Sequence, residues 1–111
     1  MFAAAEAGKR GRSVLIVDHA EKPGEKIRIS GGGRCNFTNV HASAKQFISQ
    51  NPHFCISALK RFTARDFIKR VEARGIAYLE KTLGQLCCYG SAQQIIDMLT
   101  DDMAAAGVVL R

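Results

Sequence analysis

The sequence is poor in several features that would point to particular classes of protein. It contains no tryptophan, and its longest apolar runs fall well short of the about 20 residues that a membrane-spanning helix requires. Basic residues follow the short apolar start at Met1–Ala7 rather than precede it, which is not the order of a signal peptide. Aromatic residues make up 7% of the chain, too few for the stacked aromatic rows of RNA-binding sheets. We therefore expect neither a membrane protein, nor a secreted protein, nor an aromatic RNA-binding sheet.

The cysteines are few and show no metal-binding pattern. They are Cys35, Cys55, Cys87 and Cys88; none is spaced as C-x-x-C, and the three histidines do not cluster with them. This argues against a zinc site and favours reduced thiols in a cytoplasmic protein. The adjacent Cys87 and Cys88 would point to opposite faces of a strand, which favours two buried thiols over a vicinal disulfide. Cys35 is expected to be a small packing residue, since no partner cysteine is near it in the sequence.

Composition and charge fit one globular domain. Apolar residues make up 47% and charged residues 23% of the 111 residues. The net charge of +6 permits an anionic partner, whether nucleic acid, membrane surface or nucleotide phosphate. A stretch from Lys60 to Arg74 holds six basic residues. Its ordinary meaning is a solvated helix face, with nucleic-acid binding as the weaker alternative.

The first third of the chain predicts a helix, a strand and a bare loop. Phe2–Arg12 is alanine-rich and predicts a helix. Ser13–Asp18 is apolar apart from its ends, which is typical of a strand covered on both faces in a parallel sheet. Pro23 and Gly24 indicate a turn. The stretch Ile29–Asn39, ISGGGRCNFTN, is poor material for the interior of a helix or a strand.

The middle of the chain predicts helices followed by a hairpin. Ala42–Phe62 is expected to be helical in two pieces, broken near Asn51 and Pro52. Thr63 and Asp66 have the spacing of a helix-capping box. The residues that follow, 76–90, predict two short strands around a turn at Leu83 and Gly84.

The last third predicts a helix and a second apolar strand. Ser91 can cap a helix over Ala92–Ala106, whose Ile95, Ile96, Leu99 and Met103 have the spacing of a buried face. The run VVLR then begins a further strand. Strands separated by helices predict an α/β fold with a parallel sheet.

Asp18 ends the first predicted strand. In a dinucleotide-binding βαβ unit, an acid at this place accepts hydrogen bonds from the adenosine ribose hydroxyls. Such a unit also needs G-x-G-x-x-G before its first helix, and the sequence has none there. The alternative is that Asp18 merely begins a turn.

The glycine-rich stretch combines a flexible backbone with many polar side chains. Three consecutive glycines can adopt positive φ and expose backbone N–H groups to an anion. Arg34 adds a charged planar donor suited to phosphate. These features suit a nucleotide phosphate or a polar heterocycle. The alternative from composition alone is a flexible surface loop.

The order of residues in this stretch is more informative than its composition. The string KIRISGGGRCNFTN resembles the loop of the BaiN-like family of NAD(P)/FAD-dependent oxidoreductases, bacterial flavoproteins with a glutathione-reductase-like FAD domain. The segments EKTLGQL and GSAQQIIDML also resemble members of this family. The resemblance implies a Rossmann-type FAD-binding domain over residues 1–111. Within it, residues 42–90 would form a helical insert and a short hairpin.

The resemblance also implies a set of cofactor-binding residues. It places Asp18 at the family's ribose-binding acid and the loop from Lys26 to Asn39 along FAD, with NAD(P)H as a candidate reductant. The implied FAD-binding residues are Asp18, Lys26, Ser30, Gly32, Gly33, Arg34, Cys35, Asn36 and Thr38. No metal ligand is implied, and no catalytic residue is assigned.

Members of this family are several times longer than 111 residues. The resemblance therefore implies a partial FAD-binding domain of a flavin-dependent oxidoreductase that is not active by itself. Two alternatives remain from the residues. One is a small basic nucleic-acid-binding module, although nucleic acid is not the expected partner. The other is an inactive protein that self-associates through an uncovered sheet edge.

Overall fold

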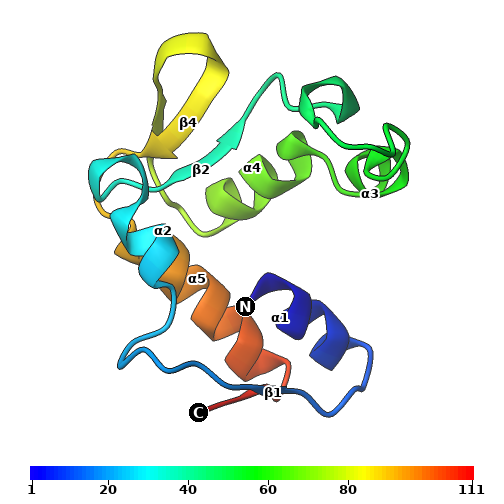
Figure 1. Ribbon diagram of the computed structural model, residues 1–111. Coiled ribbons are helices and arrows are strands. Elements are labelled where there is room, and N and C mark those ends of the chain that lie inside the picture. The colour runs from blue at the N-terminus through cyan, green and yellow to red at the C-terminus, as the bar shows by residue number, and fades with distance from the viewer. The chain divides into compact units, whose positions relative to one another are not determined.

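The computed structural model describes all residues from Met1 to Arg111, which form two compact units (Figure 1). The first unit consists of Met1–Cys35 and Ser91–Arg111, and the second of Asn36–Gly90. The second unit is thus inserted into the chain of the first.

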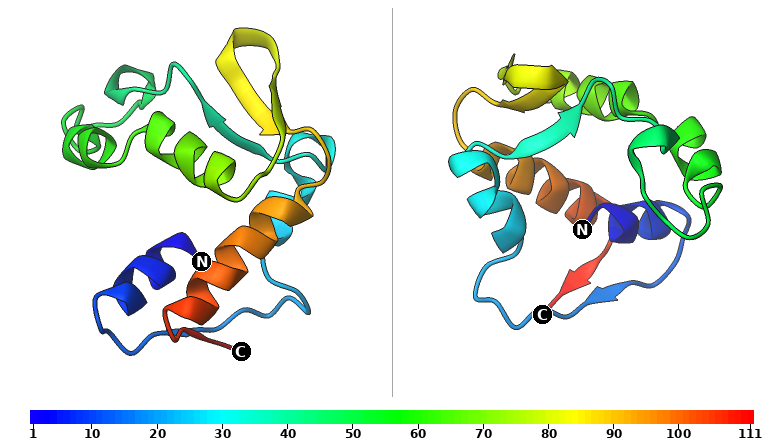
Figure 2. Two further views of the ribbon diagram at one scale, coloured as in Figure 1. Left: turned by 180° about the vertical axis from the view of Figure 1, so that it is seen from behind. Right: turned by 45° about the horizontal axis from the view of Figure 1, so that its top comes forward.

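The first unit contains helices and a small parallel sheet. Its helices α1 and α5 lie side by side, as both views of Figure 2 show. Its elements in chain order are α1 (Phe2–Lys9), β1 (Leu15–Ile16), α2 (Glu25–Ile29), the 3-10 turn η1 (Ser30–Gly32), α5 (Gln93–Ala105) and β5 (Val109–Leu110).

The apolar face of α5 that the sequence predicts forms much of the core of the first unit. Ile95, Ile96, Leu99 and Met103 are all buried, which confirms the expected helix and its inward face. Gly8 of α1 lies against the backbone of Ala106, so a side chain at Gly8 would collide with it. The glycine that weakens the propensity of α1 therefore allows close helix packing. Ser91 caps α5 as expected, since its Oγ accepts a hydrogen bond from the Gln93 N–H over 3.1 Å.

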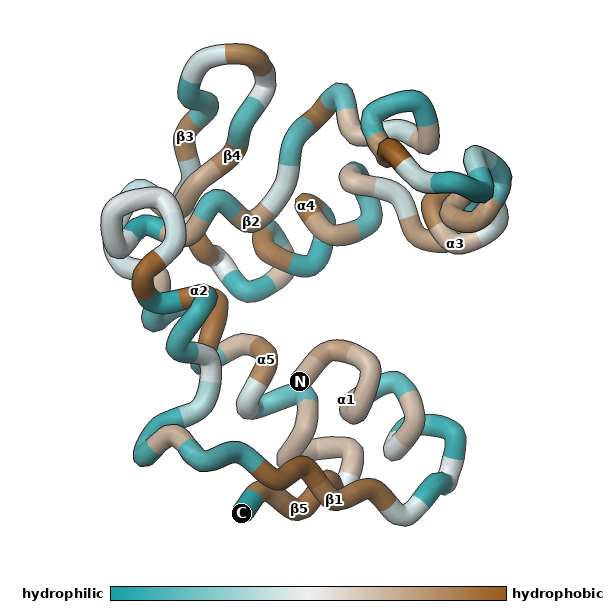
Figure 3. Tube along the Cα trace, in the orientation of Figure 1, coloured by the Kyte–Doolittle hydropathy of each residue, from teal (hydrophilic) through white to brown (hydrophobic).

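Strands β1 and β5 are parallel, as predicted, with Leu15 opposite Val109 and Ile16 opposite Leu110. Helices flank them, which confirms the α/β class. The expectation that both faces of the first strand are covered is wrong. Leu15 and Val17 lie two residues apart, hence on one face, and are 57% and 75% exposed, so apolar side chains along this sheet are left open to solvent. Figure 3 shows the hydrophobic colour of the chain at β1 and β5.

The second unit is an antiparallel sheet with helices beside it. The strand order is β2-β4-β3, and α4 packs against β2. Its elements in chain order are β2 (Asn36–Asn39), the 3-10 turn η2 (Ala44–Gln46), α3 (Ile56–Arg61), α4 (Ala64–Ala73), β3 (Tyr78–Glu80), the 3-10 turn η3 (Thr82–Gly84) and β4 (Gln85–Cys88).

Aromatic and aliphatic side chains fill the space between α4 and this sheet. The Phe37 ring lies 6.0 Å from that of Phe67 on α4 and 5.7 Å from that of Tyr78 on β3, measured between centroids. Cys87 and Cys88 on the central strand are both fully buried thiols, as expected for opposite faces of a covered strand. The predicted hairpin is also confirmed.

The structure corrects two expectations for the middle of the chain. The stretch Ile29–Asn39 is not all loop: Asn36–Asn39 forms β2, because the backbone of β4 supplies hydrogen-bonding partners from almost fifty residues away. Residues 42–62 contain less helix than predicted. Only Ala44–Gln46 and Ile56–Arg61 are helical, since polar side chains such as Ser49 and Asn51 bond to nearby backbone N–H groups instead.

No helix in the structure combines the length and the apolar composition needed to cross a membrane.

Candidate functional site

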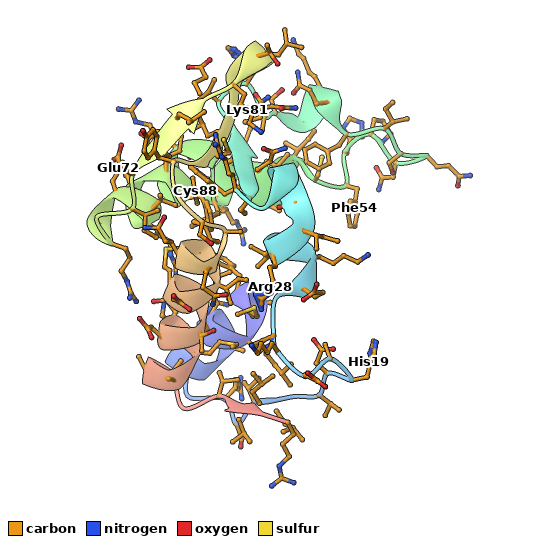
Figure 4. The ribbon with its side chains drawn as sticks, turned by 90° about the vertical axis from the view of Figure 1, so that its left-hand side faces the viewer. His19, Arg28, Phe54, Glu72, Lys81 and Cys88 are labelled. Carbon is orange, nitrogen blue, oxygen red and sulfur yellow. The ribbon has the colours of Figure 1, made fainter.

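Asp18 stands where β1 ends. Its backbone N–H donates to the carbonyl oxygen of Arg111 over 2.9 Å, which continues the ladder between β1 and β5 by one residue. Its carboxylate is exposed and accepts a hydrogen bond from the Ala20 N–H at 3.1 Å. His19, labelled in Figure 4, has its Nδ1 3.7 Å from the same carboxylate oxygen. The acid therefore starts a turn and also keeps an oxygen open to a ligand.

A hollow of about 440 Å³ lies beside this carboxylate. Residues at the starts of α1 and α2 contribute to its lining. The lining residues are Met1, Asp18, His19, Ala20, Gly24, Glu25, Lys26 and Ile27. Two of the residues implied to bind FAD, Asp18 and Lys26, thus line one hollow.

The basic residues near the hollow differ in their roles. Lys26 is exposed and makes no hydrogen bond or ion pair, so its ammonium group is available to a ligand. Arg28 instead donates to the Gln93 side chain at 3.0 Å and to the Pro23 carbonyl oxygen at 3.2 Å. Arg28 thereby fastens α2 to α5. Lys26 is thus an unpaired cation on the lining of the hollow, whereas Arg28 has a structural role.

Gly24 fixes the start of α2. Its φ of +79° lies in the left-handed region, and a Cβ there would come within 3.0 Å of Ile96 Cγ1. The sequence indicates a turn at Pro23 and Gly24 but does not reveal the contact with α5. Met1 was likewise missed as a lining residue, because no motif marks it.

The glycine turn lies one short helix further along the chain. Lys26 is the second of the five residues of α2, so about 6 Å along the helix axis separate it from Ser30, where the turn begins. Gly31, Gly32 and Gly33 have φ of +60°, +68° and +84°, all in the region that favours glycine. A Cβ at Gly32 or Gly33 would meet nothing within 4 Å, so this backbone faces open space that another molecule can occupy. The expected bare backbone is present.

The polar groups of the turn are partly used by the turn itself. The carbonyl oxygen of Ser30 accepts from the Gly33 N–H at 3.2 Å and the Cys35 N–H at 3.0 Å. The Ser30 hydroxyl donates to the Ile27 carbonyl oxygen at 2.9 Å. The carbonyl oxygen of Gly33 accepts from the Ala92 N–H at 2.9 Å, which ties the turn to the start of α5. Ser30 therefore acts first as the organiser of the turn.

Arg34 and Cys35 end the turn in opposite environments. Arg34 is exposed, and its guanidinium forms no ion pair. Cys35 is 4% exposed and has a φ of +53°, which is unusual for a residue with a side chain. The left-handed backbone and the buried thiol fit the expected packing role. Cys35 directs the chain into β2 while Arg34 faces solvent.

The remaining implied residues, Asn36 and Thr38, lie on β2 in the second unit. Asn36 is opposite Cys87 and Thr38 is opposite Leu86, with an irregularity in the register between them. They flank Phe37, whose ring enters the core. The alternation of side chains along a strand places Phe37 on the opposite side from its two polar neighbours.

The residue types around the hollow and the glycine turn of the first unit can be compared with what a dinucleotide requires. A carboxylate at the end of a parallel strand can accept from ribose hydroxyls, while a lysine favours phosphate. An open glycine backbone admits close approach of a flat ring or a phosphate. The residues present therefore fit an adenine dinucleotide such as FAD.

A protein-family model, described as the HI0933-like protein Rossmann domain, matches residues 1–111. The chain belongs to this family. It is a flavoprotein family whose Rossmann domain binds FAD, which confirms the resemblance and the Rossmann-type fold that the glycine-rich string implied.

The curated relatives that this chain resembles have two different names. The chain is 58% identical over 111 residues to the ribosomal RNA dihydrouridine synthase of Escherichia coli strain K12. It is 49% identical over 113 aligned residues to the protein of the same name from Haemophilus influenzae. Each alignment covers 100% of this chain and 28% of the relative, so the chain spans little more than a quarter of their length.

A third relative is more distant. It is the 3-dehydro-bile acid delta(4,6)-reductase of Clostridium scindens, 39% identical over 49 residues, which is 44% of this chain and 12% of that protein.

Proposed function

We propose that this chain is part of the FAD-binding domain of a bacterial flavin-dependent oxidoreductase. The observation that carries the proposal is the shared hollow: Asp18 and Lys26 line it together with the starts of α1 and α2. In the proposed complex, Asp18 binds the adenosine ribose, and Lys26 with Arg34 neutralises the pyrophosphate. Gly32 and Gly33 give the cofactor room, and Cys35, Asn36 and Thr38 complete the residues implied along it.

We further propose that the whole protein reduces uridine in ribosomal RNA. The two relatives aligned over the entire chain are named ribosomal RNA dihydrouridine synthases. Dihydrouridine is uridine that has gained two hydrogens across a carbon–carbon double bond, and bound flavin is a carrier of hydride for such a reduction. NAD(P)H is the proposed source of the hydride, and the cytoplasm, where ribosomal RNA resides, is the proposed location.

The cofactor assignment is tested by comparing two flavins. FAD carries an adenosine ribose and a pyrophosphate, whereas FMN carries neither. We expect FAD to raise the midpoint of thermal unfolding of the chain and FMN at the same concentration to raise it by much less. Equal shifts with both flavins, or no shift with FAD, would contradict the assignment of Asp18 and Lys26 to the adenosine end.

Self-association is a second candidate property, favoured by one observation. The sheet of β1 and β5 has two strands, and Leu15, Val17 and Val109 are 57%, 75% and 49% exposed along it. Such an edge can pair with another copy of the chain. We expect sedimentation velocity to show a concentration-dependent dimer that the double substitution Leu15→Lys/Val17→Lys removes. A monomer at every concentration would rule this out.

A further inference from the structure

The positive charge of the chain is concentrated in the second unit. Residues 36–90 contain eight lysines and arginines against three acids, a net charge of +5, whereas the rest of the chain has a net charge of only +1. The unit without the proposed FAD hollow thus carries nearly all of the +6 charge. FAD binding in the first unit does not explain this distribution.

Most of this charge gathers where α3 meets α4. Lys60 and Arg61 end α3, and Arg65 and Lys69 lie one helical turn apart on α4. All four side chains are exposed. We call these four residues, together with Lys45 on η2, the basic junction.

The acids nearest to the basic junction are Asp66 and Glu72, which are hydrogen-bonded elsewhere; only Lys69 interacts electrostatically with Asp66. Asp66 is engaged at the start of α4, where it accepts from the Thr63 N–H at 2.8 Å and from the Thr63 hydroxyl at 2.7 Å. Glu72 accepts from the Tyr78 hydroxyl at 2.7 Å. Lys60, Arg61 and Arg65 form no ion pair. Their charges are therefore available to an anionic partner.

An apolar hollow of about 310 Å³ lies within the basic junction. Its apolar walls are formed by Ile56 and Leu59 of α3 and by Ala44 of η2. Two cationic residues, Lys45 and Lys60, also line it. An apolar floor between two cations suits a flat ring whose neighbouring groups are phosphates.

Exposed phenylalanines precede the hollow in the chain. Phe47 is 52% exposed and Phe54 is 80% exposed, although burial of a phenylalanine side chain is strongly favourable. Figure 4 labels Phe54 on the segment before α3. Aromatic rings beside lysines and arginines are the combination that binds unpaired nucleotides, because bases stack on the rings while the cations bind phosphates.

We propose that the second unit binds single-stranded RNA through the basic junction, its hollow and Phe54. This inference rests on the proposed function, because the RNA reductase activity supplies the reason for an RNA-binding surface. Unpaired RNA fits better than a duplex, since exposed rings can stack only on bases that are free of pairing partners.

The first experiment separates local charge from net charge. Binding of a fluorescein-labelled single-stranded oligouridine to the full chain is followed by anisotropy over a range of salt concentrations. The test variant is Lys45→Ala/Lys60→Ala, and the matched control is Arg10→Ala/Arg12→Ala in the first unit. All four residues are exposed, and each variant removes the same charge from the protein.

We expect the test variant to bind about tenfold more weakly at low salt. Its slope of log affinity against log salt should be shallower by about 1.4, because two phosphate contacts are lost at about 0.7 each. The control should keep the wild-type slope. Equal weakening of both variants, or of neither, overturns the proposal, as does equal competition by polyglutamate, which has charge but no bases.

The second experiment tests stacking. Phe54→Ala should weaken oligouridine binding about tenfold and leave the salt slope unchanged, because a ring contributes stacking and not charge. Wild-type affinity in this variant would overturn the single-stranded assignment. Circular dichroism of each variant checks that the fold is retained.

The same proteins distinguish this inference from the proposed function. The test variants should keep the FAD-dependent rise in unfolding temperature, because none of the changed residues lines the FAD hollow. RNA binding without an FAD effect would refute the cofactor proposal alone. If FAD raises the unfolding temperature but the substitutions in the basic junction leave RNA binding unchanged, this inference alone is refuted.

Discussion

Asp18 and Lys26 line the same hollow, although seven residues and a turn separate them in the chain. The turn at Pro23 and Gly24 brings α2 back toward the end of β1, and the contact of Gly24 with Ile96 holds it there. A carboxylate and an ammonium group thereby line one hollow, which is the arrangement that the proposed ribose and phosphate contacts require. Preorganisation of this kind lowers the entropy cost of binding.

The first prediction concerns Asp18→Asn. Asparagine keeps a side-chain oxygen for the Ala20 N–H and removes only the charge. Without ligand, the free energy of unfolding should stay within about 1 kcal/mol of the wild-type value, since the site is exposed. The shift produced by FAD should be strongly reduced. Arg12→Gln, an exposed change in the same unit away from the hollow, is the control and should leave that shift intact.

The second prediction compares two glycines with similar φ. Gly24→Ala and Gly32→Ala both place a side chain in the left-handed region, which costs about 1–2 kcal/mol. A Cβ at Gly24 would also press on Ile96, whereas one at Gly32 would meet open space. Urea unfolding should therefore show a larger loss of stability for Gly24→Ala. Gly32→Ala should nevertheless weaken the binding of FAD, although it disturbs the fold less than Gly24→Ala does.

If the two alanine variants lost equal stability, the packing of Gly24 on Ile96 would not contribute. If Gly32→Ala bound FAD like the wild type, the open glycine backbone would not be part of the cofactor site.

The third prediction uses the capping box of α4. Hydrogen bonds from the Thr63 backbone and hydroxyl lower the pKa of Asp66 below its ordinary value, with a smaller contribution from Lys69. A lowered folded-state pKa means that the stabilisation is present above the unfolded pKa of about 3.9 and is lost as pH falls through the folded pKa. Thr63→Ala should cost about 1 kcal/mol at neutral pH. Its difference from wild type in thermal unfolding should shrink as the pH falls below about 4.

Asp66→Asn is the control, because it removes the titrating group. In an Asp66→Asn background, the loss of stability caused by Thr63→Ala should not change with pH in the acid range. A pH-independent difference between wild type and Thr63→Ala would show that Asp66 does not titrate with the cap.

Much of this architecture is predictable from local patterns. The capping box of Thr63 and Asp66 and the buried face of α5 rest on residues three or four apart, so the sequence shows them directly. The carboxyl end of β1 likewise marks Asp18. The glycine-rich string identifies the family because its residue order, more than its composition, is distinctive.

What local patterns do not predict are the contacts that join distant residues. Strand β2 consists of Asn36–Asn39, which has a weak strand propensity, and it forms because β4 pairs with it. The exposure of Leu15 and Val17 depends on what covers the sheet, which an apolar run cannot specify. The hollow beside Asp18 needs the Gly24 contact with Ile96, about seventy residues away.

The last prediction concerns Tyr78 on β3. Its hydroxyl donates to Glu72 at 2.7 Å, and this bond, aided by a little desolvation and the negative charge of Glu72, raises the pKa of Tyr78 above its ordinary value. The chain has no tryptophan and only one other tyrosine, Tyr89. A spectrophotometric titration of the Tyr89→Phe variant, in which Tyr78 is the one remaining tyrosine, should therefore show a tyrosinate step that Glu72→Gln moves to lower pH. A raised folded-state pKa means that this bond stabilises the fold below the unfolded pKa of about 10 and is lost as pH rises through the folded value. The loss of stability of Tyr78→Phe relative to wild type should thus be present at neutral pH and vanish at strongly alkaline pH. A tyrosinate step that Glu72→Gln does not move would show that the bond to Glu72 does not hold the Tyr78 proton.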